Sequence, residues 1–308
     1  MLTVSNYHYI REDFSAPFSS IFGVTPDAFE NQITLLKSTG KFISPDYLTE
    51  NIDPILNADD NYILITFDDG LKEQYELAKP ILDKHDIQAL YFVNSINHIE
   101  KEVSLVHKIH LVRSQTEPTF LLNYIETKLS DYDVKLSGTE TEKALLHYNY
   151  DDADSAFLKY LLNFKLTSIQ LKTVIDSLFS ERFDSGKVCT DLYMNQQQLQ
   201  DLANGNMLGN HTHSHFALGL LSPEVIEAEI SKTIRFLNTF KKNDGLTISY
   251  PYGAMEACVS PVPETAAALG HKIGFTMERG SNGFGADKLL LKRFDCNDLV
   301  GGKNYNKN

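Results

Sequence analysis

Long apolar runs, basic clusters and paired cysteines are all scarce in this sequence of 308 residues. No segment approaches the roughly 20 consecutive apolar residues that a membrane-spanning helix needs. The opening residues MLTVSNYHYIRED lack the basic region and the long apolar stretch of an export signal, so the sequence predicts a cytoplasmic protein. With 41 acidic and 28 basic residues, the formal net charge of -13 argues against nucleic acid and anionic lipid as partners.

The three cysteines, Cys189, Cys258 and Cys296, are an odd number, lie far apart and form no C-x-x-C pair. This spacing indicates neither a disulfide framework nor a thiolate zinc site. We therefore expect reduced thiols in a core. The 42% hydrophobic content is enough to fill a sizeable core, in one large α/β domain or two ordinary ones.

The strongest local pattern is a strand, a helix and a strand in succession. An apolar run at 62–67 is followed by a helical pattern at 71–82 and by the β-rich run ALYFV from Ala89. This spacing predicts a parallel βαβ unit, in which ligand sites lie at the carboxyl ends of the strands. Asp68 and Asp69 stand at such an end, and two adjacent like charges there require a compensating charge.

The remainder of the chain alternates again after a helical interruption. Residues 102–186 show helical periodicity with acidic loops, such as the apolar stripe at 171–178, and the segment NYDDADS resembles an exposed connection. Helices are then predicted to begin at Asn195 and at Ser222. The runs LTISYPYG, KIGFTM and LLLKRFD predict strands, and the final residues GGKNYNKN are expected to fray.

The segment GNHTHSH brings His211, His213 and His215 together. On a helical turn His211 and His215 would share one face, and on a strand all three would. Neutral imidazole is a favoured ligand of zinc, and a catalytic site typically uses three protein ligands and leaves a position for water. An aspartate near Asp69 would complete the set, and the other carboxylate would be left to act as general base on the metal-bound water.

Each pattern alone has an ordinary explanation. A single DDG is most often a turn with solvated carboxylates, and histidine clusters also occur on surfaces. Both patterns stand at the end of an apolar run in an α/β alternation, and that combination is far less expected by chance.

The motifs TFDDG, HTHSH and SYPYG occur in this order and resemble those of the polysaccharide deacetylase family, the NodB-homology carbohydrate esterases. The resemblance covers roughly residues 1–97 and 188–300. It implies an α/β fold, an irregular (β/α)7 barrel over 1–101 and 187–308, with 102–186 as a helical insertion. It also implies a hydrolase that removes N-acetyl groups from sugars with one divalent metal ion, zinc before nickel, cobalt, iron or manganese.

Within this resemblance, Asp68 takes the place of the base, and Asp69, His211 and His215 take the places of the metal ligands. Thr212 occupies its expected position in the H-(S/T)-x-x-H motif. His213 is then left with a secondary, substrate-facing role.

The loop SYPYG is implied to shape the groove. In it, Pro251 and Gly253 set the conformation, and the backbone N–H of Tyr252 helps the metal to stabilise the oxyanion. The family's late general-acid histidine is missing from LLLKRFDCNDL. However, TVSNYHYIR resembles the circularly rearranged branch that includes poly-N-acetylglucosamine deacetylases, so His8 is implied to protonate the departing amine.

The family's arginine partner of the base is also missing before SYPYG. Arg293 on the last strand is the first substitute and Arg11 a weaker one, although a surface arginine is the ordinary interpretation of either. His271 is interpreted as structural.

The implied function is N-deacetylation of an amino-sugar-containing saccharide or glycan precursor, in the assembly of cell-surface polysaccharide. A carbohydrate is the expected partner, and no membrane span is expected. The alternatives are a non-catalytic carbohydrate-binding relative and a metallohydrolase of an O-acetyl ester or a cyclic amide. From its place after the second barrel strand, the insertion at 102–186 is expected to cover the groove as a lid.

Overall fold

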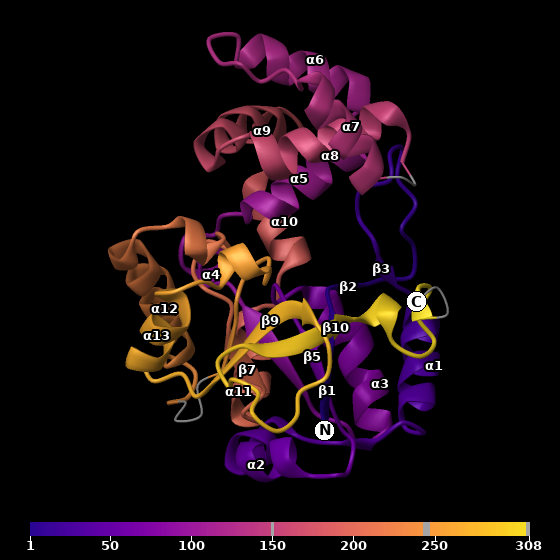
Figure 1. Cartoon of the computed structure of the whole chain (residues 1–308), viewed down its shortest axis with the longest axis vertical. Helices are drawn as coiled ribbons and strands as arrows, with labels where there is room; N and C mark the ends of the chain where they lie inside the picture. Colours follow the sequence, from indigo (N-terminus) through magenta and orange to yellow (C-terminus); the bar gives the residue numbers. More distant parts are fainter. Residues whose placement is uncertain (149–150, 243–246, 306–308) are drawn as a thin grey trace. The chain divides into compact units, whose positions relative to one another are not determined.

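The computed structural model of this chain describes residues 1–148, 151–242 and 247–305 (Figure 1). The chain forms two compact units, which we call the barrel unit (Met1–Asp13, Gly23–Glu102 and Val188–Asn308) and the helical unit (Phe14–Phe22 and Val103–Lys187). The sequence analysis did not group 14–22 with the helices. Parts of the segments NYDDADS, LTISYPYG and GGKNYNKN, at 149–150, 246 and 306–308, lie outside the described residues.

Seven parallel strands of the described chain close into a barrel. Their order is β1, β10, β9, β8, β7, β6 and β5, and β5 pairs back to β1. They span Leu2–Tyr7 (β1), Tyr62–Phe67 (β5), Ala89–Val93 (β6), Leu208–Asn210 (β7), Thr247–Ser249 (β8), Ile273–Arg279 (β9) and Leu291–Asp295 (β10). Strand β4 (Lys41–Phe42) pairs in parallel with the first residues of β5, and β2 (Tyr9–Ile10) pairs with β3 (Gly23–Val24) in a separate small sheet. The predicted α/β fold and (β/α)7 barrel are confirmed.

The strands read as apolar runs because both of their faces are covered. In β5, Leu64 joins a core cluster with Leu2, Val4 and Leu291 from other barrel strands. Its neighbours Ile63 and Ile65 belong to a second cluster, which includes residues of the surrounding helices. Since side chains alternate along a strand, Thr66 lies on the same face as Leu64, at the carboxyl end of the strand.

Helices surround the strands of the barrel unit (Figure 1). They are α1 (Pro26–Leu36), α2 (Pro45–Asn57), a π-helix (Gln74–Ala78) continued by α3 (Lys79–Lys84), α4 (Ile96–Ile99), α11 (Gln196–Asn204), α12 (Pro223–Leu237) and α13 (Val262–Ala268), with short 3-10 turns at Leu218–Leu220, Met255–Ala257 and Cys296–Asp298. Asn195 caps α11 through a capping box, and Ser222 precedes α12, so both predicted helix starts are confirmed.

The helical unit contains α5 (Leu105–Ser114), α6 (Pro118–Lys128), α7 (Gly138–His147), α8 (Ala153–Tyr160), a π-helix (Leu161–Lys165) and α9 (Ser168–Arg182), and α10 (Ser185–Leu192) leads back to the barrel unit. Val174, Ile175 and Leu178 of the predicted stripe are buried in α9. All three cysteines are buried free thiols, as predicted. Among the described residues, no helix combines the length and hydropathy required to cross a bilayer.

Candidate active site

The predicted site residues lie in loops that follow different strands of the barrel. The loops after β1, β5, β7 and β8 carry His8, Asp68, Asp69, His211 and Pro251. Because the barrel strands are parallel, their carboxyl ends open at one edge. The paired register of β1 and β5, with Tyr7 opposite Phe67, sets His8 beside Asp68. The side-chain amide of Gln74 ties these two loops together, since it donates to the carbonyls of His8 at 2.9 Å and Asp68 at 2.6 Å.

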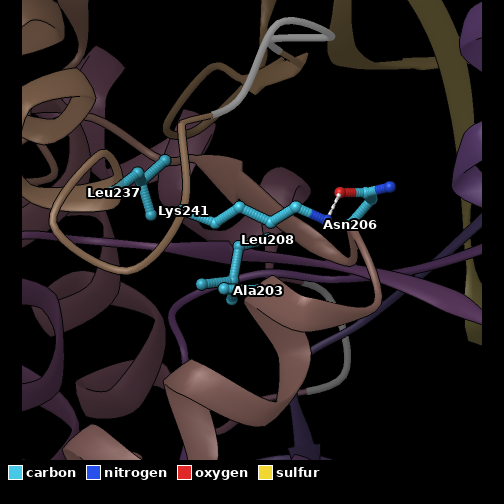
Figure 2. A pocket seen from close by; sticks show the side chains of 5 residues that line it. All are labelled: Ala203, Asn206, Leu208, Leu237 and Lys241. Atoms are coloured by element: carbon cyan, nitrogen blue, oxygen red, sulfur yellow. Dashed lines mark hydrogen bonds between the residues drawn. The ribbon is translucent and has the colours of Figure 1, made fainter.

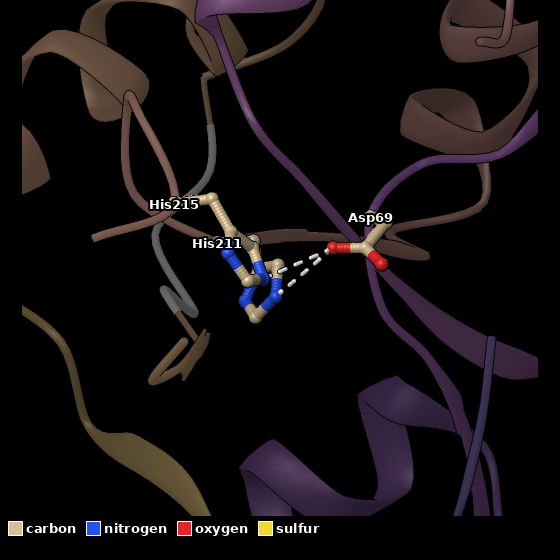
Figure 3. A group of neighbouring side chains, drawn as sticks. All are labelled: Asp69, His211 and His215. Atoms are coloured by element: carbon tan, nitrogen blue, oxygen red, sulfur yellow. Dashed lines mark ion pairs between the residues drawn. The ribbon is translucent and has the colours of Figure 1, made fainter. Parts of the chain in front are cut away.

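Asp69, His211 and His215 form one buried cluster, in which three ligand atoms lie within 4.8 Å of one another. Figure 3 shows both imidazoles directed at the Asp69 carboxylate. Oδ1 of Asp69 lies 3.5 Å from Nε2 of His211 and 3.3 Å from Nε2 of His215. Two imidazole nitrogens and one carboxylate oxygen are a ligand set that suits zinc and related divalent ions.

The hydrogen bonding around His211 fits a cation. Its Nδ1 lies 2.7 Å from the carbonyl oxygen of Ser249 and donates to it, which leaves the lone pair of Nε2 facing Asp69. Burial alone would lower the pKa of His211, but the charges of Asp68 and Asp69 outweigh it and raise the pKa above the ordinary value. This pocket therefore favours positive charge, which a divalent ion would supply.

The backbone at the site adopts unusual conformations. Asp69, Thr212, His215 and Tyr252 have φ angles of 79°, 63°, 61° and 62°, in the left-handed region that non-glycine residues rarely enter. Each such residue costs on the order of 1–3 kcal/mol and persists only where the surroundings hold it. The three loops that carry the family motifs thus contain four of the seven described non-glycine residues with a positive φ, and the others are Asp86, Lys101 and Asn206.

Asp68 is the centre of a buried polar network. Arg293 makes a bidentate pair with it, at 3.0 Å between Nη1 and Oδ1 and 2.8 Å between Nη2 and Oδ2. The amide of Asn6 donates to Oδ2 at 3.1 Å. Burial alone would raise the pKa of the Asp68 carboxyl, but the charge of Arg293 outweighs it, with help from His211 and His8, and the pKa lies well below its usual range. Asp68 is therefore held ionised.

Arg293 is fully buried, so the interpretation as a surface arginine was wrong. Besides Asp68 it contacts the hydroxyl of Ser249 at 2.8 Å and the carbonyl of Thr276 at 2.8 Å. The weaker substitute, Arg11, pairs instead with Glu73 at 2.7 Å.

The sequence analysis missed Asn6, Thr66 and Ser249, which complete the network around Arg293. Asn6 Oδ1 accepts from Arg293 Nη1 at 2.9 Å and from Thr66 Oγ1 at 3.1 Å. The available signal was the presence of polar residues inside otherwise apolar strand runs, as in LTVSNY and YILITF. A polar side chain in a barrel interior requires a polar partner.

His8 lies next to the base. Its Nε2 is 3.9 Å from Oδ2 of Asp68, and its side chain is 37% exposed, so it reaches both the base and solvent. The predicted acid and base are therefore neighbours in space, although 60 positions separate them in the sequence.

His213 is not brought to the cluster. Its Nδ1 lies 2.8 Å from the hydroxyl of Ser95 and its Nε2 lies 2.9 Å from Oε1 of Glu100. His213 is 3% exposed, so the structure gives no support to a substrate-facing role. His271 is also buried, with Nε2 3.2 Å from the amide of Asn210.

The loop Pro251–Gly253 follows β8 and borders the cluster. Tyr252 is 53% exposed, and its ring centroid lies 5.1 Å from that of His215. Gly253 has φ of 57°, and a Cβ there would lie 2.4 Å from the backbone nitrogen of Met277. Only glycine fits this turn without displacing β9.

Figure 2 shows a separate small hollow in the barrel unit, in which Lys241 donates to Asn206 at 2.7 Å. Its volume of about 10 Å³ holds roughly one water molecule. Leu208, which lines it, begins β7, whereas His211 follows the end of β7. The hollow is therefore not part of the candidate site.

Comparison with known families agrees with this geometry. The profile of the family described as polysaccharide deacetylase matches residues 56–114 and 140–274, more than half of the chain. The chain belongs to the polysaccharide deacetylase family. It is thus a hydrolase that acts on the carbon–nitrogen bond of carbohydrate acetamides, and the non-catalytic alternative is not supported. No curated protein sequence matches the chain.

Several solved structures share the fold. The deacetylase PplD from Streptococcus pyogenes, in complex with acetate, has 19% identity and a TM-score of 0.57, over 96% of this chain and 91% of PplD. IcaB from Ammonifex degensii has 16% identity and a TM-score of 0.57, over 99% and 94%. A de-N-acetylase from Aggregatibacter actinomycetemcomitans has 12% identity and a TM-score of 0.54, over 96% and 95%.

Proposed function

We propose that this protein is a metal-dependent N-deacetylase of an amino-sugar-containing saccharide or glycan precursor. The observation that carries the proposal is the pairing of two buried groups at one barrel edge. One is the Asp69, His211 and His215 cluster, and the other is the adjacent carboxylate of Asp68, held by Arg293.

Asp69, His211 and His215 would hold the ion, with zinc as the first choice for two imidazoles and a carboxylate. When bound, a divalent ion supplies Lewis acidity for a water molecule and for the acetamide carbonyl. The bond from His211 to the Ser249 carbonyl supports this assignment, because such outer partners fix the tautomer of a ligating histidine.

Asp68 would take the proton of the attacking water. Its ionised state is supported by its contacts with Arg293 and Asn6, which also fix both carboxylate oxygens in orientation. A base within reach of the water contributes about 10²–10⁴-fold to the rate. The low pKa keeps Asp68 ionised across the physiological range, and its place beside the metal-ligand cluster is what puts it within reach of the water.

His8 would deliver a proton to the leaving nitrogen. An amide nitrogen leaves poorly as an anion, so the reaction needs an acid on that side. The partial exposure of His8 and its 3.9 Å separation from Asp68 support this role. The backbone N–H of Tyr252 would donate to the developing oxyanion, and Pro251 and Gly253 would set the turn that aims it.

Acetate release tests the proposal. We expect zinc-loaded protein to release acetate from N-acetylglucosamine oligosaccharides, and chelation followed by zinc addition to abolish and restore the release. Asp68→Asn is expected to lower kcat by about 10²–10⁴-fold while zinc stays bound. Equal background release from wild type and variant would overturn the proposal.

O-acetyl ester and cyclic amide substrates, assayed in parallel, separate N-deacetylation from the other hydrolyses.

The lid role of residues 102–186 is likewise a proposal, and it rests on their place in the sequence. A lid of this kind favours a small or specific substrate over a long polymer. Removal of the segment is expected to broaden the range of oligosaccharide lengths that release acetate. An unchanged range would contradict it.

A further inference from the structure

The turn between His211 and His215 needs an external support. It is neither a helix nor a strand, and Thr212 and His215 have φ angles of 63° and 61°. Left-handed conformations are unfavourable for residues with a Cβ, so the turn does not hold itself. The N–H of Thr212 is accepted by Asn210 Oδ1 at 2.8 Å, which supports the start of the turn. The end of the turn, at His215, needs a second support.

Glu229 on α12 supplies that second support. Its Oε2 accepts the backbone N–H of Ser214 at 2.7 Å, and its Oε1 accepts the Ser214 hydroxyl at 2.8 Å. Because both oxygens accept, the ionised carboxylate is the form that fits. Glu229 is 7% exposed, and bonds to a charged acceptor in a buried place are stronger than neutral ones.

Glu229 contacts the segment of one of the two histidine ligands, His215. Ser214 directly precedes His215, so the two bonds hold the His213–Ser214 peptide and the Ser214 side chain, one residue before the ligand. His211 has its own anchor at the Ser249 carbonyl. Glu229 is held in place because Ile226 and Ile230 of the same helix are packed in the core. His215 is therefore oriented by α12.

We propose that Glu229 is a positioning residue that presets the His215 turn and thereby sets the affinity of the site for a divalent metal. A ligand held in its bound conformation loses less freedom on binding, and outer partners of metal ligands typically change affinity about 10–100-fold. This inference rests on the proposed function, since it takes the Asp69, His211 and His215 cluster as a metal site.

The test is the dissociation constant for Zn²⁺, measured on the metal-free full chain by competition with a chromophoric chelator. Glu229→Gln keeps the shape but loses the charge and one acceptor, and we expect it to weaken zinc binding about 10–100-fold. Glu227→Gln is the matched control, because Glu227 is exposed on the same helix, and its zinc affinity is expected to equal that of wild type. The melting temperature of each metal-free protein is measured alongside.

Ser214→Ala is a milder second variant, because it removes the hydroxyl and keeps the backbone N–H. We expect a smaller loss of zinc affinity than in Glu229→Gln. Zinc affinity equal to wild type in Glu229→Gln, with or without a lower melting temperature, would overturn the inference. If Glu229→Gln does not fold, unchanged affinity in Ser214→Ala overturns it. A wild type that binds no zinc instead defeats the proposed function itself.

Discussion

The helical unit and the carboxyl edge of the barrel use polar side chains in opposite ways. In the helical unit, Ser137 and Thr167 close capping boxes at the starts of α7 and α9. Among its described residues, no non-glycine residue has a positive φ. At the barrel edge, Asp68 and Arg293 are buried as an ion pair, and the neighbouring loops contain left-handed residues such as Asp69.

The polar side chains of the first kind stabilise local structure, whereas buried charges and strained backbone are typical of a functional site. At the starts of α7 and α9, local preference and capping agree with the helical structure that forms. Buried charges and strained backbone are costly, and proteins tolerate them mainly at functional sites. The barrel edge combines both features around the candidate site, whereas the helical unit has an ion pair of buried Lys108 with Asp176 but no strained non-glycine backbone among its described residues.

The largest effect on stability is expected from Arg293→Met. The change leaves the Asp68 carboxylate buried and unpaired, which typically costs about 3–5 kcal/mol of unfolding free energy. Urea unfolding of the metal-free protein measures the loss. Arg11→Met is the matched control, because Arg11 pairs with Glu73 where the two side chains are 25% and 16% exposed. Its expected loss is smaller, because the Arg11 and Glu73 side chains keep contact with solvent, whereas those of Arg293 and Asp68 are 0% and 3% exposed. If both variants lose the same unfolding free energy, the Asp68–Arg293 pair is no more important for stability than the Arg11–Glu73 pair.

A pair of glycine substitutions is expected to give opposite signs in the two regions. Gly253→Ala places a Cβ 2.4 Å from the Met277 nitrogen at a φ of 57°. It should destabilise the protein by about 1–3 kcal/mol. Gly138→Ala, at the start of α7, meets no atom within 4 Å and should stabilise by up to about 1 kcal/mol. The melting temperatures of both variants measure these effects. A higher melting temperature in Gly253→Ala would contradict the conclusion that the backbone at the site is strained.

The α/β alternation from residue 62 onward was readable from the sequence, because buried parallel strands are apolar on both faces. The closed barrel was implied by the family resemblance, and α1, β4 and α2 were not predicted. The run at 62–67 and the run from Ala89 became β5 and β6. The caps at Asn195 and Ser222 gave two helix starts. The grouping of Phe14–Phe22 with the helical unit was not readable, because no local pattern in that segment reports a contact distant in sequence.

The site was readable only in part. The sequence pointed to Asp69, His211 and His215, but treated the histidine segment as a helix or a strand. The left-handed residues in the actual turn separate His213 from the other two, and no periodicity describes such a turn. The burial of Arg293 was also missed. Its polar partners come from other strands, and the sequence order does not show which of them converge.

The smallest effect is expected at Glu140 in the helical unit. The backbone N–H of Ser137 lowers its pKa most, followed by Lys165, and the pKa lies at about 2. A pKa lowered in the folded state adds stability above the unfolded value of 4.5, and this contribution is lost as the pH falls from there towards 2.

Lys165→Met removes one cause of the lowered pKa, so the carboxyl of Glu140 should titrate at a higher pH. Carboxyl chemical shifts between pH 2 and 5 measure this, with Lys143→Met on the same helix as control. The Glu140 side chain is 27% exposed, whereas those of Arg293 and Asp68 are 0% and 3% exposed. The shift at Glu140 should therefore shrink more in about 1 M salt than the loss in Arg293→Met, since salt screens buried pairs far less than solvent-accessible ones. If salt leaves the pKa shift of Glu140 unchanged, the Glu140–Lys165 pair is as resistant to screening as the Asp68–Arg293 pair. The two regions would then not differ in how their ion pairs respond to salt.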